Sequence, residues 1–159
     1  MERPSDEEIY REHSDALMRY AVSLVGRSDA SDIVSQAVVN ALGSDSWPKV
    51  SNHKAYLYRA VLNQARKTHR DRQRRWSKEL REANERNRPA EVEYRPEVLE
   101  AILKLSPRQR AAIYLAYWEQ LTVEEIADHL GVSAGTVRRH LARARSKLRT
   151  VLFAWEPVT

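Results

Sequence analysis

The fold of the C-terminal part of the chain is decided by residues 122–150, which read Thr-Val-Glu-Glu-Ile-Ala-Asp-His-Leu-Gly-Val-Ser-Ala-Gly-Thr-Val-Arg-Arg-His-Leu-Ala-Arg-Ala-Arg-Ser-Lys-Leu-Arg-Thr. Thr122 can cap a short helix, and Glu125 stands three residues later as its capping-box partner. Gly131 supplies the residue that ends this helix. The spacing of the apolar residues gives it one buried face, made of Ile126, Ala127 and Leu130.

A second helix follows and opens at Ser133 or Ala134. Its apolar positions recur at spacings of four, three and four residues, as one face of a helix requires: Val137, Leu141, Ala144 and Leu148. The rest of residues 134–150 carries six Lys and Arg side chains and no acid. Two short helices across a tight turn, the second one basic and exposed, are typical of a helix-turn-helix that reads the major groove. A basic helix that is merely solvated is the alternative interpretation.

Composition limits the class of protein further. The chain has 159 residues, enough for one ordinary domain or two small ones, and its net charge of +5 favours a polyanionic partner. The absence of cysteine excludes a disulfide framework and a thiolate metal site. No apolar run approaches the roughly 18 residues that span a bilayer, and the acidic N-terminus is not a signal peptide. We therefore expect a cytoplasmic protein without membrane insertion, and we assign no catalytic residue, metal ligand or cofactor.

The positive charge is concentrated in two segments. Residues 54–75 hold eight bases and one acid, and residues 134–150 hold six bases, so the two segments carry fourteen of the 27 Lys and Arg residues. Residues 1–46, in contrast, hold nine acids and four bases. A protein that needed only solubility would intermix the two signs. The pattern predicts two separate contact surfaces for one nucleic acid.

Caps and turn residues divide the N-terminal part into helices. Ser5 can cap a first helix that ends at Gly26, and Ser28 or Asp29 opens a second helix that ends at Gly43. Turn-forming residues then surround a Trp-Pro pair and predict a loop over residues 43–52. A third helix begins near His53 and is expected to run past Arg70.

The C-terminal part begins after a polar segment. Residues 76–96 are rich in Arg, Glu and Asn and contain two prolines, which predicts a flexible linker. A short helix follows from Glu97, and Ser106-Pro107 opens another that extends to about Glu119. We therefore predict an all-α fold of two small helical domains joined by a flexible linker, with the helix-turn-helix in the C-terminal one. The predicted domains are residues 1–75 and 97–153, with the linker at 76–96.

The third helix carries the second basic surface. Tyr56 and Tyr58 lie at its head, and Trp47 lies in the loop before it. Guanidinium groups along a helix can follow phosphates while aromatic rings stack on unpaired bases, so this surface suits melted or single-stranded DNA. A solvated basic helix with core tyrosines and a core tryptophan is the alternative. The polar side chains of this face are Arg59, Asn63, Arg66, Lys67, Arg70 and Arg74.

In this order and at this spacing, the elements resemble the extracytoplasmic-function (ECF) sigma factors, group IV of the bacterial RNA polymerase sigma subunits. In the C-terminal part the resemblance rests on Leu-Ser-Pro-Arg-Gln-Arg at 105–110 and on residues 119–148. In the N-terminal part it rests on Asp-Ala-Ser-Asp-Ile-Val at 29–34 and on Ala-Tyr-Leu-Tyr-Arg-Ala-Val-Leu-Asn-Gln-Ala-Arg at 55–66. The resemblance covers nearly the whole chain apart from residues 76–96 and the last few.

The resemblance implies a promoter-recognition subunit with core RNA polymerase, promoter DNA and an anti-sigma protein as partners. The second helix would bind the polymerase clamp through Asp32, Gln36 and Asn40. The minus-ten element would be held by the loop and the third helix, through Trp47, Tyr58, Arg59, Asn63, Arg66, Lys67 and Arg70. The minus-thirty-five element would be read by the C-terminal helix, through Thr136, Arg138, Arg139, Ala142, Arg143 and Lys147.

Two other classes of protein are alternatives to this one. A transcriptional activator of the response-regulator type would have a similar helix-turn-helix, but residues 1–96 show neither alternating strands nor an acidic phosphorylation pocket. An enzyme such as a serine recombinase is the third class, but no Ser stands in a recognisable nucleophile context. The five histidines are scattered, and we expect His129 and His140 to contact phosphate or solvent. The sequence therefore favours a non-enzymatic, DNA-binding sigma factor.

Overall fold

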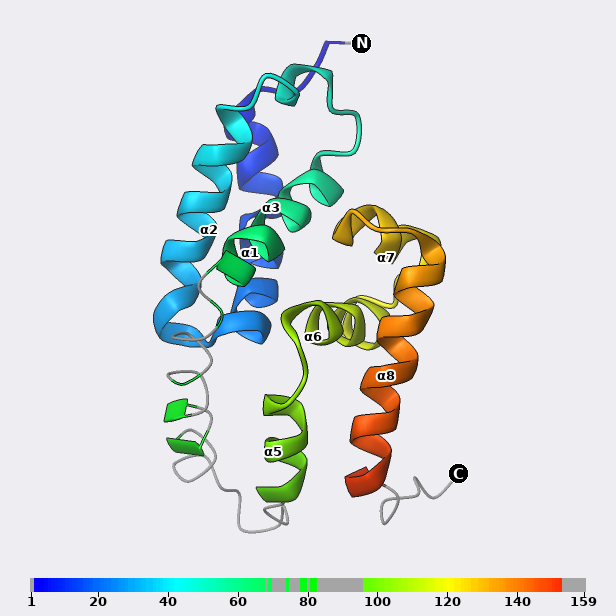
Figure 1. Cartoon of the computed structure of the whole chain (residues 1–159). Helices are drawn as coiled ribbons and strands as arrows, with labels where there is room; N and C mark the ends of the chain where they lie inside the picture. Colours follow the sequence, from blue (N-terminus) through cyan, green and yellow to red (C-terminus); the bar gives the residue numbers. More distant parts are fainter. Residues whose placement is uncertain are drawn as a thin grey trace.

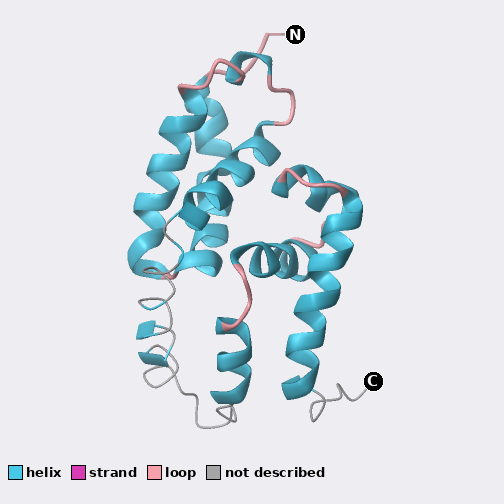
Figure 2. Cartoon of the chain, viewed as in Figure 1, coloured by secondary structure: helices cyan, strands magenta, loops and turns pink. Residues whose placement is uncertain are grey.

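The computed structural model describes residues 2–67, 69, 74, 78–79, 81–82 and 96–152, and the regular structure of these residues is helical (Figure 1). Figure 2 shows helices and loops and no strand in the described part, so the prediction of an all-α chain is confirmed. None of the described helices is long and apolar enough to cross a membrane. In chain order the elements are α1 (Asp6–Val25), α2 (Arg27–Leu42), η1 (Trp47–Lys49), α3 (His53–Lys67), α5 (Pro96–Leu103), α6 (Pro107–Ile113), η2 (Tyr114–Trp118), α7 (Val123–Leu130) and α8 (Ala134–Leu152).

Local caps begin the helices where the sequence predicts them. The Ser5 hydroxyl accepts the backbone N–H of Glu8 at 3.2 Å, and the Thr122 hydroxyl accepts that of Glu125 at 3.1 Å. In both cases the glutamate side chain returns a bond to the cap's own N–H, so each is a complete capping box. Ser106 forms a third capping box, with Gln109 as its partner and a proline at the first helical position.

Two helix boundaries differ from the prediction. Helix α2 begins at Arg27 rather than at Ser28 or Asp29, because Gly26, with φ 84°, already turns the chain between α1 and α2. The predicted helix from Pro107 to about Glu119 consists of α6 and a wider π-helical turn, η2, after which Gln120 has φ 55°.

Parts of the prediction lie outside the described residues. Helix α3 is described to Lys67, and Arg70 falls outside. Of the predicted linker at 76–96, only residues 78–79, 81–82 and 96 are described.

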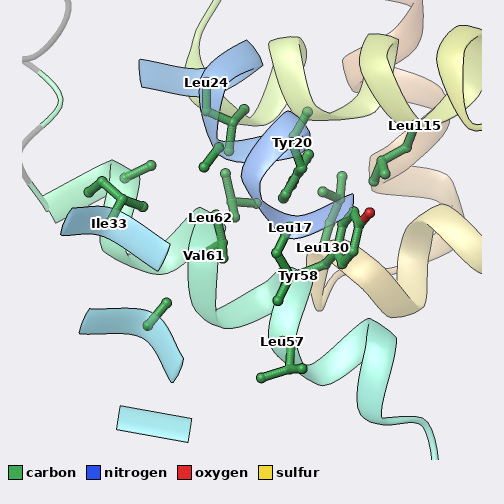
Figure 3. Close-up of a cluster of buried hydrophobic side chains, with 14 of the residues drawn as sticks. Leu17, Tyr20, Leu24, Ile33, Leu57, Tyr58, Val61, Leu62, Leu115 and Leu130 are labelled. Carbon is green, nitrogen blue, oxygen red and sulfur yellow. The ribbon is translucent and has the colours of Figure 1, made fainter. Parts of the chain in front are cut away.

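The hydrophobic core joins the two halves of the chain, a feature that the sequence did not predict. Buried side chains of α1, α2 and α3 belong to one cluster with those of α6, η2, α7 and α8. Figure 3 draws part of this cluster, with Tyr20 and Tyr58 from the first half and Leu115 and Leu130 from the second. Helix α7 contacts α3, and α6 contacts α1, so the two predicted helical domains pack on each other in this conformation (Figure 1).

A buried arginine fastens α6 to α1. The Arg110 side chain is 4% exposed, and its Nη1 donates to the backbone oxygen of Leu24 at 2.8 Å. Its Nε donates to the backbone oxygen of Leu105 at 3.1 Å. Leu24 stands in the last turn of α1, where backbone oxygens lack helical partners and the helix dipole favours a cation. Burial lowers the pKa of Arg110 to about 10, which leaves the guanidinium charged at neutral pH.

Candidate nucleic-acid interface

The turn between α7 and α8 has the geometry of a helix-turn-helix. Gly131 ends α7 in the left-handed region, with φ 70° and ψ 36°, and its N–H donates to the backbone oxygen of Ala127 at 2.9 Å. The Ser133 hydroxyl then accepts the N–H of Thr136 at 3.2 Å and so caps the start of α8. A side chain at residue 131 would be strained in this conformation, which is why glycine ends α7.

Helix α8 separates an apolar face from a basic one, as the sequence predicts. Val137, Leu141 and Ala144 are buried against the rest of the molecule. The other side is exposed over its central turns, and four predicted minus-thirty-five residues lie there: Arg138, Arg139, Ala142 and Arg143. Within the part of the chain that the structure describes, no ion pair engages Arg139 or Arg143.

Three of the six predicted residues of α8 have partners within the protein. Thr136 is half-buried, and its hydroxyl lies 2.9 Å from that of Ser133. Arg138 approaches Glu124 at 3.6 Å with both side chains well exposed, so this ion pair is weak. Lys147 donates to the side-chain oxygen of Gln109 at 2.9 Å and to the backbone oxygen of Lys104 at 3.3 Å. Lys147 therefore helps to hold α8 to the start of α6.

A pocket opens between the end of α2 and the exposed face of α3. Its volume is about 390 Å³, within the range of small-molecule sites. Arg59, Asn63 and Lys67 contribute its basic and polar wall. The remaining lining residues are Asn40, Ala41, Ser44, Tyr56, Ala60 and Gln64.

Two aromatic residues predicted to contact DNA are buried in this conformation. Trp47 is 3% exposed, and its indole N–H donates to a carboxylate oxygen of Asp6 at 2.8 Å. The Arg3 guanidinium lies 5.4 Å from the centre of the Trp47 ring. Trp47 therefore closes the base of the loop over α1 instead of presenting its ring to a base, which is the core interpretation that the sequence left open.

Tyr58 is buried because the C-terminal half covers it. Its ring stacks on Tyr20 of α1 with centroids 4.5 Å apart, and it forms a T-shaped pair with His129 of α7 with centroids 5.1 Å apart. Its hydroxyl donates to the Glu119 carboxylate, and burial, with that bond, raises the pKa of Tyr58. The predicted DNA contact of Tyr58 does not fit this structure, since the side chain has no exposed surface.

Arg59 belongs both to the pocket and to the contact between α3 and α7. Its Nη2 donates to the backbone oxygen of Asp128 at 2.9 Å, near the C-terminus of α7. A Cβ atom at Gly131 would stand 2.7 Å from the Arg59 Nε, so the glycine also makes room for this side chain. Of the other predicted residues of α3, Asn63, Arg66 and Lys67 are exposed.

The predicted polymerase-binding residues share one face of α2. Asp32, Gln36 and Asn40 are spaced by four residues and are all exposed. The Gln36 amide donates to the Asn40 side-chain oxygen at 3.0 Å. Val39, 66% exposed, adds an apolar side chain to the exposed surface of the helix.

His129 lies in the contact between α3 and α7, not at the DNA-facing surface where the sequence placed it. It is 5% exposed, and its Nδ1 donates to the backbone oxygen of Glu125 at 2.7 Å. Burial lowers the pKa of His129, with the nearby ammonium group of Lys54 acting in the same direction. The folded chain therefore holds a proton on this ring less tightly than the unfolded chain does.

We expect acid to destabilise the fold through His129. As the pH falls through the ordinary histidine value of 6.5, the unfolded chain gains more protons than the folded one, so the free energy of unfolding decreases. His129→Gln is expected to lose less stability than the wild type between about pH 7.5 and about pH 5.5. Urea unfolding at both pH values measures the difference. An unchanged pH dependence in the variant would contradict this role of His129.

Sequence reasoning does not find the contact between α3 and Glu119, which follows η2. Lys54 donates to the Glu119 carboxylate at 2.9 Å, and the same carboxylate accepts from Tyr58. Lys54 and Glu119 are 65 residues apart in the sequence, so no local spacing signals the pair.

Comparison with known proteins defines the class to which this arrangement belongs. Family models for Sigma-70 region 2 and Sigma-70 region 4 match residues 9–75 and 95–148. The region 4 match contains α7 and α8 as far as residue 148, and the pocket beside α3 lies within the region 2 match. The class is therefore that of the sigma-70 factors.

Individual relatives identify a narrower family within the sigma-70 factors. The RNA polymerase sigma-E factor of Streptomyces antibioticus is 34% identical over 152 residues, which cover 92% of this chain and 83% of that protein. The ECF RNA polymerase sigma factor EcfG of Rhodopseudomonas palustris is 31% identical over 147 residues, 87% of this chain and 80% of that protein. The chain belongs to the ECF RNA polymerase sigma factors.

A solved structure shares the fold. It is that of the sigma factor RpoE of Bartonella quintana in complex with the anti-sigma factor NepR, with a TM-score of 0.64 and 24% sequence identity. The similarity covers 94% of this chain and 98% of that one.

Proposed function

We propose that this chain is a group IV sigma factor that binds core RNA polymerase, directs it to specific promoters and assists promoter melting. The observation that carries the proposal is the pair of exposed basic surfaces, one on α8 and one beside the pocket on α3, within a chain of this family. In the proposed division, residues 1–75 bind polymerase and the minus-ten element, and residues 97–153 bind the minus-thirty-five element. Residues 76–96 connect them.

Helix α8 is proposed to read the minus-thirty-five element in the major groove. Arg139 and Arg143 are exposed, and an arginine can bond a guanine edge through two donors. Arg138 joins them once its weak ion pair with Glu124 is released. Ala142 offers a small apolar surface beside these arginines, while Thr136 and Lys147 border the helix at either end.

The pocket beside α3 is proposed to take an unpaired base of the minus-ten element. Asn63 can donate to and accept from a base edge, and Lys67 adds a cation for the phosphate backbone. Arg66 extends the basic surface beyond the pocket. Trp47 then supports the loop from within instead of stacking on the base.

The exposed face of α2 is proposed as the polymerase contact. Asp32, Gln36 and Asn40 offer a carboxylate and two amides on successive turns, and the exposed Val39 adds apolar area. Such a face suits a helical partner surface with polar groups at its rim.

An anti-sigma protein is proposed as a further partner, by analogy with the complex of the Bartonella quintana factor. Because core RNA polymerase and promoter DNA are cytoplasmic, the chain is proposed to act in the cytoplasm.

Run-off transcription with purified core RNA polymerase tests the proposed function. The wild-type chain should yield transcripts from a defined subset of a genomic promoter library, whereas core polymerase alone should not. The absence of any promoter-dependent transcript would overturn the proposal.

Asn63→Ala is expected to impair melting but not duplex binding. The pocket loses one hydrogen-bonding partner for the unpaired base, which should cost about 0.5–1.5 kcal/mol of binding free energy at the minus-ten element. Permanganate reactivity of promoter thymines measures melting, and gel shift of a duplex that carries only the minus-thirty-five element measures docking. Normal permanganate reactivity in the variant would show that Asn63 does not contact the unpaired base.

Arg139→Ala and Lys147→Ala are expected to differ in specificity. Loss of a bidentate guanine contact by Arg139 should cost about 1–3 kcal/mol and relax the preference at one base pair of the minus-thirty-five element. Lys147 has protein partners, so its loss should weaken binding equally on all sequences. Affinities measured over all single-base variants of the element separate the two cases. Equal losses at every base pair for both variants would contradict base reading by Arg139.

A further inference from the structure

One wall of the proposed minus-ten pocket depends on the loop between α2 and α3. Ser44 of this loop and Tyr56 of α3 both line the pocket. The Tyr56 hydroxyl donates to the Ser44 side-chain oxygen at 3.1 Å, and the same oxygen accepts the backbone N–H of Ser46 at 3.2 Å. The position of the loop therefore decides where this wall stands relative to the Asn63 side chain, which also lines the pocket.

Trp47 supports this wall from within the loop. It begins η1, and its ring packs at a tilt against the Tyr56 ring, with centroids 5.7 Å apart. Its backbone oxygen accepts the N–H of Val50 at 3.1 Å and so closes the η1 turn. Because Trp47 contacts Tyr56 directly, a shift of Trp47 changes the wall of the pocket.

Two residues at the start of the fold hold Trp47 in place. The chain before α1 lies beside the loop (Figure 1), and Arg3 Nη2 donates to the Trp47 backbone oxygen at 3.1 Å. The Arg3 guanidinium lies 5.4 Å from the centre of the indole ring. The Asp6 carboxylate accepts the indole N–H at 2.8 Å and lies 3.9 Å from the Arg3 guanidinium. Side chains 44 and 41 positions away thus fix the backbone and the ring of Trp47.

Arg3 makes these contacts from the surface of the molecule. It is exposed, whereas Trp47 is 3% exposed, so removal of Arg3 leaves the hydrophobic core intact. In the part of the chain that the structure describes, Arg3 does not line the pocket. Its loss therefore acts on the position of the loop and not on the chemistry of the pocket. A loop that is held less firmly must be ordered when the ligand binds, which costs part of the binding free energy.

We propose that Arg3 and Asp6 are positioning residues for the minus-ten element: by holding Trp47, they keep the loop over residues 43–52 where it closes the pocket around an unpaired base. This inference rests on the proposed function. Neither residue contacts the base, so both act on base selectivity through the loop. Loss of Arg3 reduces the preference for the captured base and leaves recognition of the minus-thirty-five element unchanged.

Hydrogen exchange of the free chain tests whether Arg3 holds the loop. In Arg3→Ala, exchange over residues 43–52 should be at least about threefold faster, because the N–H groups of Trp47 and Val50 donate to backbone oxygens within this loop. Arg11→Ala is the matched control, since Arg11 is an exposed arginine of α1 that pairs with Glu7 of the same helix. The control should exchange as the wild type does, and both variants should unfold at nearly the wild-type urea concentration. Unchanged exchange in Arg3→Ala would overturn the proposal.

Base selectivity tests the consequence for the pocket. The probes are promoter forks with a single-stranded minus-ten element, bound by the full chain with core RNA polymerase. They carry each of the four bases, or an abasic site, at the position where an abasic site weakens wild-type binding most. Arg3→Ala should lower the preference for the best base over the abasic site by about threefold to tenfold, with affinity for the abasic probe unchanged within about twofold. Arg3→Lys keeps the charge but lacks the planar fork of donors, so it should recover part of the preference.

Two results of the selectivity experiment would overturn the proposal. One is a wild-type preference in Arg3→Ala. The other is an equal loss of affinity on every probe, which would indicate that Arg3 contacts a phosphate. A wild-type chain that does not distinguish any base from the abasic site would instead overturn the proposed base pocket, and the exchange measurement would still show whether Arg3 holds the loop.

Discussion

Trp47→Ala is expected to lower the free energy of unfolding by about 3–5 kcal/mol in the absence of DNA. The substitution removes a large side chain that is 3% exposed, and it leaves the Asp6 carboxylate without its indole donor. The Arg3 guanidinium also loses the ring over which it lies. These losses follow from the burial of Trp47 beneath the loop, and none of them involves a base.

Trp118 provides a matched control for this prediction. It is 70% exposed and, within the part of the chain that the structure describes, its ring stacks on that of Tyr114 with centroids 6.3 Å apart. Trp118→Ala should therefore change the free energy of unfolding by less than about 1 kcal/mol. Urea unfolding of both variants, followed by circular dichroism, gives the comparison. A Trp47→Ala protein that is as stable as the wild type but defective in melting would show that the ring acts on DNA.

Arg110→Ala is the second substitution with a large expected effect. It leaves the backbone oxygens of Leu24 and Leu105 buried without this donor and removes a charge that the helix dipole of α1 favours. A buried acceptor left without its donor costs about 1–3 kcal/mol, and this substitution affects two of them, so we expect the free energy of unfolding to fall by about 2–6 kcal/mol.

Arg110→Lys separates the effect of the charge from that of the two hydrogen bonds, and a substitution of a surface arginine serves as the control. Arg110→Lys keeps the charge but lacks the two fixed N–H directions that reach Leu24 and Leu105, so it should recover only part of the loss. Arg149→Ala removes an exposed arginine from α8 and should change stability by less than about 0.5 kcal/mol. Full stability of Arg110→Ala would show that the contact with α1 contributes nothing to the fold.

The predicted contacts of α3 show which properties of a residue can be inferred from the sequence and which cannot. Asn63 and Lys67 were assigned to an exposed polar face, and both line the pocket. Tyr58, at the head of the same helix, is predicted to contact DNA but is buried, because α7 packs on α3 there. Helical periodicity shows which residues share a face, but it does not show how many faces the other elements will cover.

The sequence by itself determined the helices, their caps and the helix-turn-helix. The bonds that define these features join residues only a few positions apart, as from Ser133 to Thr136 or from Thr122 to Glu125. The tertiary structure alone decided that the two halves share one core and that Glu119 and Arg110 join them. Arg110 bonds a residue 86 positions away, and Lys54 one 65 positions away. Such contacts depend on how whole helices pack, a property that no local pattern of residues contains.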